Sequence, residues 1–316
     1  MRCDFMARIK MKRPAEAITL ESAFKEFVIA QSAKGVAEKT LKTYHSHFHA
    51  AGKHIDTEKT FAELQKYDLD QMVVSMREAG LAHNSISSYV RVMKTFLTWC
   101  NHEGYTFLNI PTYKQKETVK GSYTDEELEK LLKRPSANCD FCEYRNWIIV
   151  NFLLDCGCRA STVRNIQNQD VSLLEHRVLF RHTKSGKIQV LPMSSRMSNL
   201  LRAYMKIRSG AAEDYLFCDD GGRMMTETSL RQAIAKYNRS RGISKTSTHL
   251  FRHTYARKYL VDCGGDAFTL QKLLGHSTLK MTKHYCAIYD ADIINNYDRF
   301  SPLAQMNRGR ERTIRK

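Results

Sequence analysis

Between residues 111 and 121 the sequence changes character, and this change most constrains how the chain can fold. The segment Pro111–Gly121 has a proline, a glycine and four charged residues of mixed sign, but few apolar ones. Such a composition is typical of interdomain linkers. A chain of 316 residues is also long enough for two domains. We therefore expect residues 111–121 to be a linker between two domains, with an ordinary surface loop as the alternative.

The part before the linker, residues 19–110, has the periodicity of an all-helical domain. Thr19 can cap a first helix, and further helices are expected at 39–54, 68–79 and 84–102, the last one capped by Asn84 or Ser85. We expect a small bundle of about four helices. Residues 1–18 are basic and lack an apolar stretch, which predicts a flexible tail and not a secretory signal. The apolar residues at helical spacing are Leu20, Phe24, Phe27, Val28, Leu41, Tyr44, Phe48, Ile86, Val90, Met93 and Leu97.

The part after the linker, residues 122–290, combines helices with a short hairpin. Thr124 and Glu127 have the spacing of a capping box, and a buried helix with Trp147 at its centre follows. Two β-type runs flank a turn at Gly186 that carries lysines, which predicts a hairpin. The expected fold class is mainly α with a small antiparallel β-sheet, as a helical bundle followed by an α+β domain. The strands are expected at 177–181 and 188–191, and later helices at 195–208, 228–241, 248–263, 267–274, 278–287 and 291–299.

The charge of the chain indicates the kind of partner. Lysine and arginine number 50 and aspartate and glutamate 33, a formal net charge of +17. A protein this basic usually meets a polyanion, so double-stranded DNA is the first candidate, and a merely basic solvated surface is the alternative. No segment approaches the ~18 uninterrupted apolar residues of a membrane span. We expect a cytoplasmic protein without a membrane partner.

The cysteines leave one alternative to weigh. There are nine, an odd number, in a chain without a secretory signal, which predicts free thiols in a reducing compartment. Cys139 and Cys142 form a C-x-x-C, and Cys156 and Cys158 follow, so four thiolates could hold zinc. Two sulfurs one residue apart suit a structural zinc site poorly, and we expect no metal. The sequence also has no phosphate-binding glycine motif for a nucleotide, so no cofactor is expected.

Four short polar motifs are each weak signals. Arg159 follows a turn of small residues after the buried helix. His249 and Arg252 lie three apart on an expected helix, where an arginine fork suits phosphate oxygens. His276 follows a helix that ends at glycine, and Tyr285 lies nine residues later. Taken singly, these are more often packing residues or solvated polar faces. A zinc pair of His249 and His253 lacks a third ligand.

Together these motifs resemble the tyrosine recombinase, or phage integrase, family in order and context. Gly157-Cys-Arg159-Ala-Ser-Thr-Val is similar to the family's first motif, and Lys184 in Thr-Lys-Ser-Gly-Lys is similar to its hairpin lysine. The H-x-x-R, L-G-H and T-x-x-Y boxes match His249–Arg252, Leu274–His276 and Thr282–Tyr285. One departure is Thr162, near which the family often has glutamate; Asp155 or Asp170 could replace it.

The resemblance implies a metal-free reaction that needs no ATP. Tyr285 is expected to attack the DNA phosphate, forming a 3′-phosphotyrosyl intermediate. Arg159, Arg252 and His276 would stabilise the charge on the phosphate. His249 is the expected general base, and Lys184 the general acid, with Lys187 as the other candidate for that role.

The resemblance also implies a biological setting. We expect a site-specific DNA recombinase, an integrase or transposase of a mobile element, with residues 19–110 as a core-binding domain of the SAM-like type. Residues 291–316 are expected to form a C-terminal helix and basic tail that docks on a neighbouring protomer in a tetramer on DNA. Accessory DNA-bending proteins are possible partners. The alternatives are a type IB topoisomerase-like nicking-resealing enzyme and a non-catalytic DNA-binding regulator.

Overall fold

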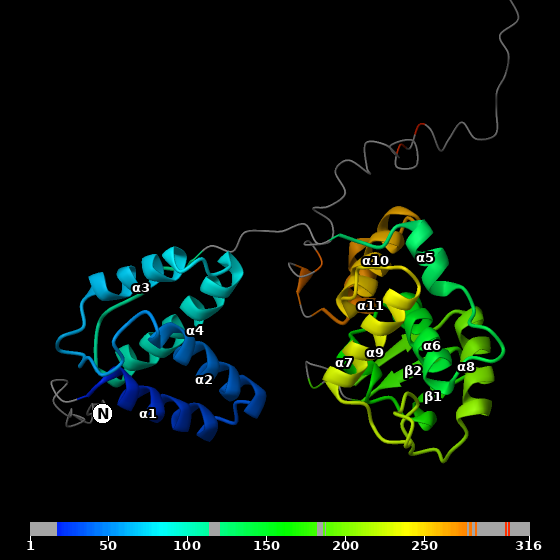
Figure 1. Ribbon diagram of the computed structural model, residues 1–316, viewed down its shortest axis with the longest axis horizontal. Helices are drawn as coiled ribbons and strands as arrows, with labels where there is room; N and C mark the ends of the chain where they lie inside the picture. The colour runs from blue at the N-terminus through cyan, green and yellow to red at the C-terminus, as the bar shows by residue number, and fades with distance from the viewer. Residues whose placement is uncertain are drawn as a thin grey trace, which may run out of the picture. The chain divides into compact units, whose positions relative to one another are not determined.

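The computed structural model describes residues 18–113, 121–181, 186, 188–276, 278–279, 282, 301 and 303. The chain divides into two compact units, Met1–Thr118 and Val119–Lys316 (Figure 1). Residues 1–17 of the expected tail at 1–18 lie outside the described residues, as do the expected helix at 291–299 and most of the one at 278–287.

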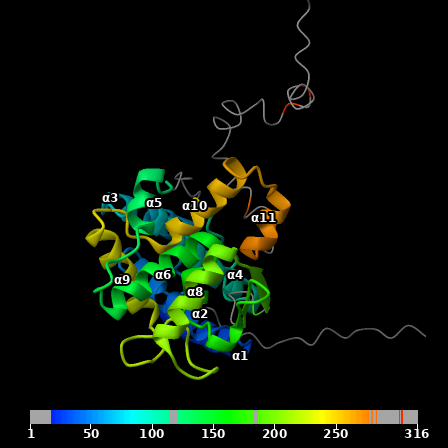
Figure 2. The same cartoon turned by 90° about the vertical axis from the view of Figure 1, so that its right-hand side faces the viewer.

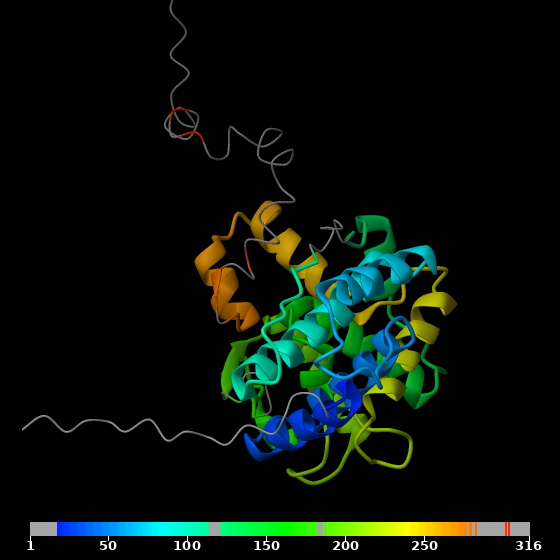
Figure 3. The ribbon, with the colours of Figure 1, turned by 90° about the vertical axis from the view of Figure 1, so that its left-hand side faces the viewer.

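The first unit is a bundle of four helices around an aromatic core. Its helices are coloured blue to cyan in Figure 3. Thr19 caps the first helix as predicted, because its hydroxyl accepts a hydrogen bond from the Ser22 N–H. In the core, Phe24 stacks on Phe48 with ring centroids 3.8 Å apart, and Phe96 meets both rings edge-on. The helices are α1 (Leu20–Ala33), α2 (Glu38–Gly52), α3 (Lys66–Glu78) and α4 (His83–Glu103).

The predicted cap of α4 was wrong. The helix begins at His83, with Ala82 in the capping position and no side-chain hydrogen bond. Asn84 and Ser85 lie within the first turn, where the Ser85 N–H already bonds to the Ala82 carbonyl. Polar residues in a first turn look like caps in a sequence, and the local backbone decides between these positions.

The second unit is built around one buried helix, α6 (Phe141–Cys156). Eleven of its residues are buried on all sides of the helix, because α5, α8, α9 and α10 all pack against it (Figure 2). The capping box of Thr124 and Glu127 starts α5 as predicted. The other α-helices described in this unit are α5 (Asp125–Leu132), α7 (Ala160–Val163), α8 (Ser195–Arg208), α9 (Glu227–Ser240), α10 (Thr248–Val261) and α11 (Ala267–Leu274).

A three-stranded antiparallel sheet of order β1-β2-β3 completes this unit. The predicted hairpin is β2 (Arg177–Phe180) and β3 (Gln189–Pro192), whose pairs run from Arg177 with Pro192 to Phe180 with Gln189. The third strand, β1 (Val171–Ser172), was not predicted, since two residues carry no readable alternation. Pro192 is tolerated because β3 lies at the sheet edge.

The predicted fold class, mainly α with a small antiparallel sheet, is confirmed by these elements. The bounds of α8 and α11 are those predicted, whereas α10 ends at Val261, two residues early. Within the part of the chain that the structure describes, no helix has the length and apolarity needed to span a bilayer.

Candidate active site

Arg252 joins three segments of the second unit that are far apart in sequence. It lies on α10 and is 4% exposed. Its Nη1 donates to the Gly157 carbonyl at 3.1 Å, and its Nη2 donates to the Leu274 carbonyl at 2.8 Å and lies 2.7 Å from His276 Nε2. One guanidinium thus fixes the end of α6, the end of α11 and an imidazole in the same place.

Both helix ends that Arg252 contacts turn through a glycine. Gly157 and Gly275 cap α6 and α11 in the left-handed conformation, with φ of 58° and 62°. A Cβ on Gly157 would overlap the ring of Tyr255 on α10, so the close approach of the two helices requires glycine here. Arg159 and His276 emerge directly after these turns, which brings the first motif and the L-G-H box together.

His276 is held on both sides of its ring. It is 9% exposed, and its Nδ1 lies 2.9 Å from the hydroxyl of the fully buried Thr282. Arginine only donates hydrogen bonds, so Nε2 must accept from Arg252 and the ring proton must face Thr282. Thr282 is the first residue of the T-x-x-Y box, so this bond links His276 to the start of that box.

The surroundings of His276 keep it neutral. Burial lowers its pKa to about 4, and the positive charges of Arg252 and Arg159 act in the same direction. Arg159 is half-buried at the N-terminus of α7, within electrostatic reach of the imidazole. The structure therefore places Arg159, Arg252 and His276 in one positively charged cluster, as the sequence predicted.

His249 lies on the exposed start of α10. It borders a groove of about 580 Å³ that is also lined by Ser161 beside the first motif and by Arg231 and Arg239 of α9. Arg252 is buried, whereas His249, three residues before it on the same helix, is exposed. The groove is open to solvent, and two arginines are among its lining residues, which suits an anionic ligand.

The base of the hairpin is anchored to its surroundings at both strands. Arg181 follows β2, and its Nε bonds at 2.6 Å to Asp170, whose side chain is 1% exposed. Gln189 opens β3, and its amide donates to the carbonyls of Lys272 and Leu273 at the end of α11. Neither anchor was predicted, since such long-range contacts leave no local sequence pattern.

Three residues of the predicted site, or candidates for its roles, lie outside the described residues. These are Lys184, Lys187 and Tyr285. Their proposed roles rest on sequence position.

The departure at Thr162 has no simple substitute. Thr162 is buried in α7. Asp155 accepts a hydrogen bond from the Ser194 N–H, and Asp170 accepts from Arg181 and from the Gln167 N–H. The two suggested carboxylates are thus engaged in holding other segments of the unit.

The cysteines give no sign of a metal site in the described part of the chain. Among those residues, no group of three or more potential ligands is arranged to hold a metal ion. Cys156 and Cys158 are buried, and burial raises the pKa of both thiols. Both thiols are expected to stay protonated, the form that does not bind metal.

The sequence pattern of the phage integrase family matches residues 122–292, more than half of the chain. The matched range contains all six predicted site residues and the cluster around Arg252. The chain therefore belongs to the phage integrase family, the tyrosine recombinases. It is a site-specific recombinase, an enzyme of DNA recombination.

Known relatives share most of the length of the chain at low identity. The tyrosine recombinase XerD of Listeria innocua serovar 6a is 23% identical over 297 residues, covering 89% of this chain and 98% of that protein. The tyrosine recombinase XerA of Thermococcus kodakarensis is 26% identical over 231 residues, covering 72% of this chain and 78% of that protein.

Solved structures share the fold. The Tn1549 transposon integrase in complex with a circular intermediate DNA matches with a TM-score of 0.72 at 17% identity, covering 90% of this chain and 100% of that one. A lambda integrase tetramer bound to a Holliday junction matches with a TM-score of 0.70 at 16% identity, covering 85% and 77%.

Proposed function

We propose that this recombinase cleaves and rejoins DNA strands through a 3′-phosphotyrosyl bond to Tyr285, without metal or ATP. The observation that carries the proposal is the cluster of Arg159, Arg252 and His276, which gathers buried positive charge and hydrogen-bond donors beside Thr282, three residues before Tyr285.

The cluster is suited to a phosphate in the transition state. Arg159 and Arg252 would donate to the non-bridging oxygens, whose charge grows as the attacking oxygen approaches. An anion bound there would offset the two arginine charges and raise the pKa of His276, so that a protonated Nε2 could donate to the phosphate as well. The arginine contact of the DNA-free protein would then give way to a phosphate contact.

The attack itself requires proton transfers at both ends. As the Tyr285 oxygen bonds to phosphorus, its proton passes to His249, because a phenol with a pKa of about 10 is mostly neutral at pH 7. The bond from phosphorus to the 5′ oxygen breaks, and Lys184 gives a proton to that oxygen. Rejoining is the reverse reaction with a new 5′-hydroxyl, so the phosphodiester energy is conserved.

The rest of the chain would bind and align the DNA. We propose residues 19–110 as the core-binding domain and residues 122–290 as the catalytic domain, joined by the linker at 111–121. The net charge of +17 supports salt-dependent contacts to phosphates from both. We propose a tetramer on two duplexes, with residues 291–316 docking on a neighbouring protomer; a lambda integrase with the same fold is a tetramer on a Holliday junction.

We propose a mobile element as the source of the DNA site. The fold matches the full length of a transposon integrase chain. The sequence relatives named XerD and XerA favour a second candidate, a recombinase whose site lies elsewhere. The test compares cleavage of DNA from the ends of the mobile element with cleavage of sites elsewhere in the same genome. The DNA that is cleaved distinguishes the two candidate functions.

The testing experiment is covalent trapping on a nicked duplex from which the cut fragment diffuses away. The readout is a protein–DNA adduct that survives SDS, with EDTA present throughout and Tyr285→Phe as the matched variant. We expect an adduct that the variant does not form. An adduct in the variant would transfer the role to another tyrosine, with Tyr289 next. DNA binding without any adduct would favour a non-catalytic regulator, and relaxation of supercoils by a monomer would favour a topoisomerase-like enzyme.

A further inference from the structure

The start of α10 lacks the cap that usually fixes a helix end. Ser247 is the N-cap residue but makes no side-chain hydrogen bond to the first turn. His249, the second residue of the helix, therefore lies on a turn that its own sequence does not secure. A free helix end frays, because its first N–H groups have no partner within the helix. The position of His249 must be fixed by contacts from outside α10.

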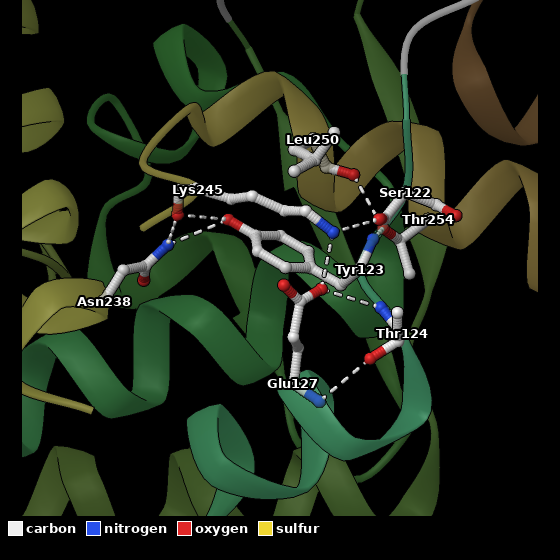
Figure 4. A network of polar contacts seen from close by, with 8 residues as sticks. All are labelled: Ser122, Tyr123, Thr124, Glu127, Asn238, Lys245, Leu250 and Thr254. Atoms are coloured by element: carbon white, nitrogen blue, oxygen red, sulfur yellow. Dashed lines mark hydrogen bonds and ion pairs between the residues drawn. The ribbon is translucent and has the colours of Figure 1, made fainter. Parts of the chain in front are cut away.

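Those contacts come from a polar network centred on Lys245, two residues before the N-cap (Figure 4). The Lys245 carbonyl accepts from Asn238 Nδ2 at 2.8 Å and from the Tyr123 hydroxyl at 3.3 Å. Asn238 is fully buried and also donates to the Tyr123 oxygen at 2.8 Å. Burial raises the pKa of Tyr123 to about 12, so its hydroxyl keeps its proton. The backbone that leads into α10 is thus held by buried groups.

The Lys245 side chain extends the network to the first residues of this unit. Its Nζ donates to the Ser122 carbonyl at 3.0 Å and to Glu127 Oε2 at 2.7 Å. The same carboxylate oxygen accepts from the Thr124 N–H in the capping box of α5. The segment Ser122–Glu127 is therefore bound to both the side chain and the backbone of Lys245.

A second connection fixes α10 beyond His249. The Tyr123 N–H donates to the Thr254 hydroxyl at 2.9 Å, and that hydroxyl donates to the Leu250 carbonyl. Figure 4 shows Tyr123 between the two connections, with Lys245 on one side and Thr254 on the other. The turn that carries His249 and Arg252 is thus held before and after by the same short segment.

We propose that Lys245 is a positioning residue for His249: with Tyr123 and Asn238 it replaces the missing cap and holds the general base at the attacking tyrosine. The proposal rests on the proposed function, in which His249 accepts the proton of Tyr285. A small displacement of a catalytic group can lower a rate about 100-fold, so loss of this network affects the chemical step more than DNA binding.

The test compares Lys245→Met with Arg241→Met. Arg241 at the C-terminal end of α9 forms a similar, partly exposed ion pair with Glu143 of α6 at 3.0 Å, and neither residue lies on α10. Single-turnover cleavage of saturating nicked DNA is measured from pH 6.5 to 9.5, with DNA affinity measured separately. We expect Lys245→Met to cleave about 10- to 100-fold more slowly at pH 7, with unchanged affinity, and Arg241→Met to cleave like the parent.

The pH profile distinguishes positioning from general damage. As pH approaches the tyrosine pKa of about 10, more Tyr285 is ionised and less base is needed, so the defect relative to the parent should shrink. His249→Ala should show the same trend, Lys245→Arg should restore most of the rate, and Tyr123→Phe should show a smaller defect of the same kind. Normalising to the fraction of protein that forms adduct removes unfolded molecules from the comparison.

Each other outcome has a definite meaning. A defect of Lys245→Met that is constant with pH, or shared by Arg241→Met, overturns the positioning role. If Lys245→Met does not fold, the positioning role is tested by the same criterion on Tyr123→Phe: its cleavage defect should shrink as pH rises. If His249→Ala itself shows no recovery at high pH, the base assignment in the proposed function fails, whatever Lys245 does.

Discussion

The guanidinium of Arg252 donates to His276 Nε2 across 2.7 Å, so the nitrogen expected to face the phosphate is occupied by an arginine in the DNA-free protein. The pair links α10 to the turn after α11. In the proposed function both groups bind the phosphate, so bound DNA would have to replace this pairing with its own contacts.

Replacing Arg252 by lysine should damage both stability and catalysis. Lysine keeps the charge but lacks the fork that reaches the Gly157 and Leu274 carbonyls together. Leaving a buried acceptor without a donor costs about 1–3 kcal/mol of unfolding free energy. Loss of one preorganised donor lowers cleavage about 10²–10³-fold. Urea unfolding and single-turnover cleavage measure the two effects, with the exposed Arg202→Lys as control. Activity close to the parent's would contradict the proposed phosphate contact.

His276 should make the protein less stable in mild acid. Its pKa is about 4 in the folded protein, against an ordinary value of 6.5. Below 6.5 the unfolded chain takes up the proton first, so unfolding free energy is lost as pH falls from 6.5 to about 4, by at most about 3 kcal/mol. Above 6.5 the contribution is complete and constant.

The measurement is urea unfolding at pH 7, 5.5 and 4.5 for the parent and for His276→Gln. Glutamine cannot titrate, so the unfolding free energy of the parent should decrease relative to that of the variant as pH falls. The exposed His102→Gln serves as control for the loss of one imidazole. Parallel pH curves for the parent and His276→Gln would show that His276 is not held neutral.

Gly157→Ala should destabilise the second unit more than Gly242→Ala. Both glycines have positive φ, 58° and 75°, and a side chain there costs about 1–2 kcal/mol. A methyl group on Gly242 meets no atom within 4 Å, whereas one on Gly157 overlaps the Tyr255 ring, which adds about 1–3 kcal/mol. Thermal unfolding of both variants compares them. Equal losses would mean that α10 can move away from the turn at no cost.

Lys184→Ala should slow the cleavage of ordinary DNA but recover on a substrate with sulfur at the 5′ bridging position. A thiol has a pKa of about 8.5, far below that of an alcohol, so a sulfur leaving group departs without a proton. Single-turnover rates on the two substrates give the comparison, and Lys187→Ala is the matched variant. Recovery in Lys187→Ala instead would transfer the role of general acid to Lys187.

The sequence predicted those parts of the fold whose signals are local. Thr19 and the pair Thr124 and Glu127 lie where capping side chains were expected, and α11 has the predicted bounds. The predictions were wrong or missing where several positions gave the same local sequence signal, or where an element gave none. Asn84 and Ser85 looked like caps although the backbone turns at Ala82, and a two-residue strand leaves no periodicity.

The sequence predicted which residues belong to the candidate site but not the contacts that hold them in place. Sequence order brought Arg159, Arg252 and His276 into one hypothesis; the structure places the three close together, and their roles stay a prediction. The hydrogen bonds of Arg252 to the Leu274 and Gly157 carbonyls and of Lys245 Nζ to the Ser122 carbonyl could not be predicted, because they join positions 22, 95 and 123 residues apart. The packing of the helices against one another sets those distances.

The two carbonyls that hold Arg252 lie at the C-terminal ends of α6 and α11, where each helix macrodipole carries about half a negative charge. These dipoles stabilise a buried cation without taking up or losing a proton. The interaction of Arg252 with these backbone carbonyls is therefore the same in acid and in base. Of Arg252 and His276, only the imidazole of His276 responds to pH. In the proposed function, a positive charge that does not change with pH would bind the phosphate beside an imidazole whose pKa the bound DNA would raise.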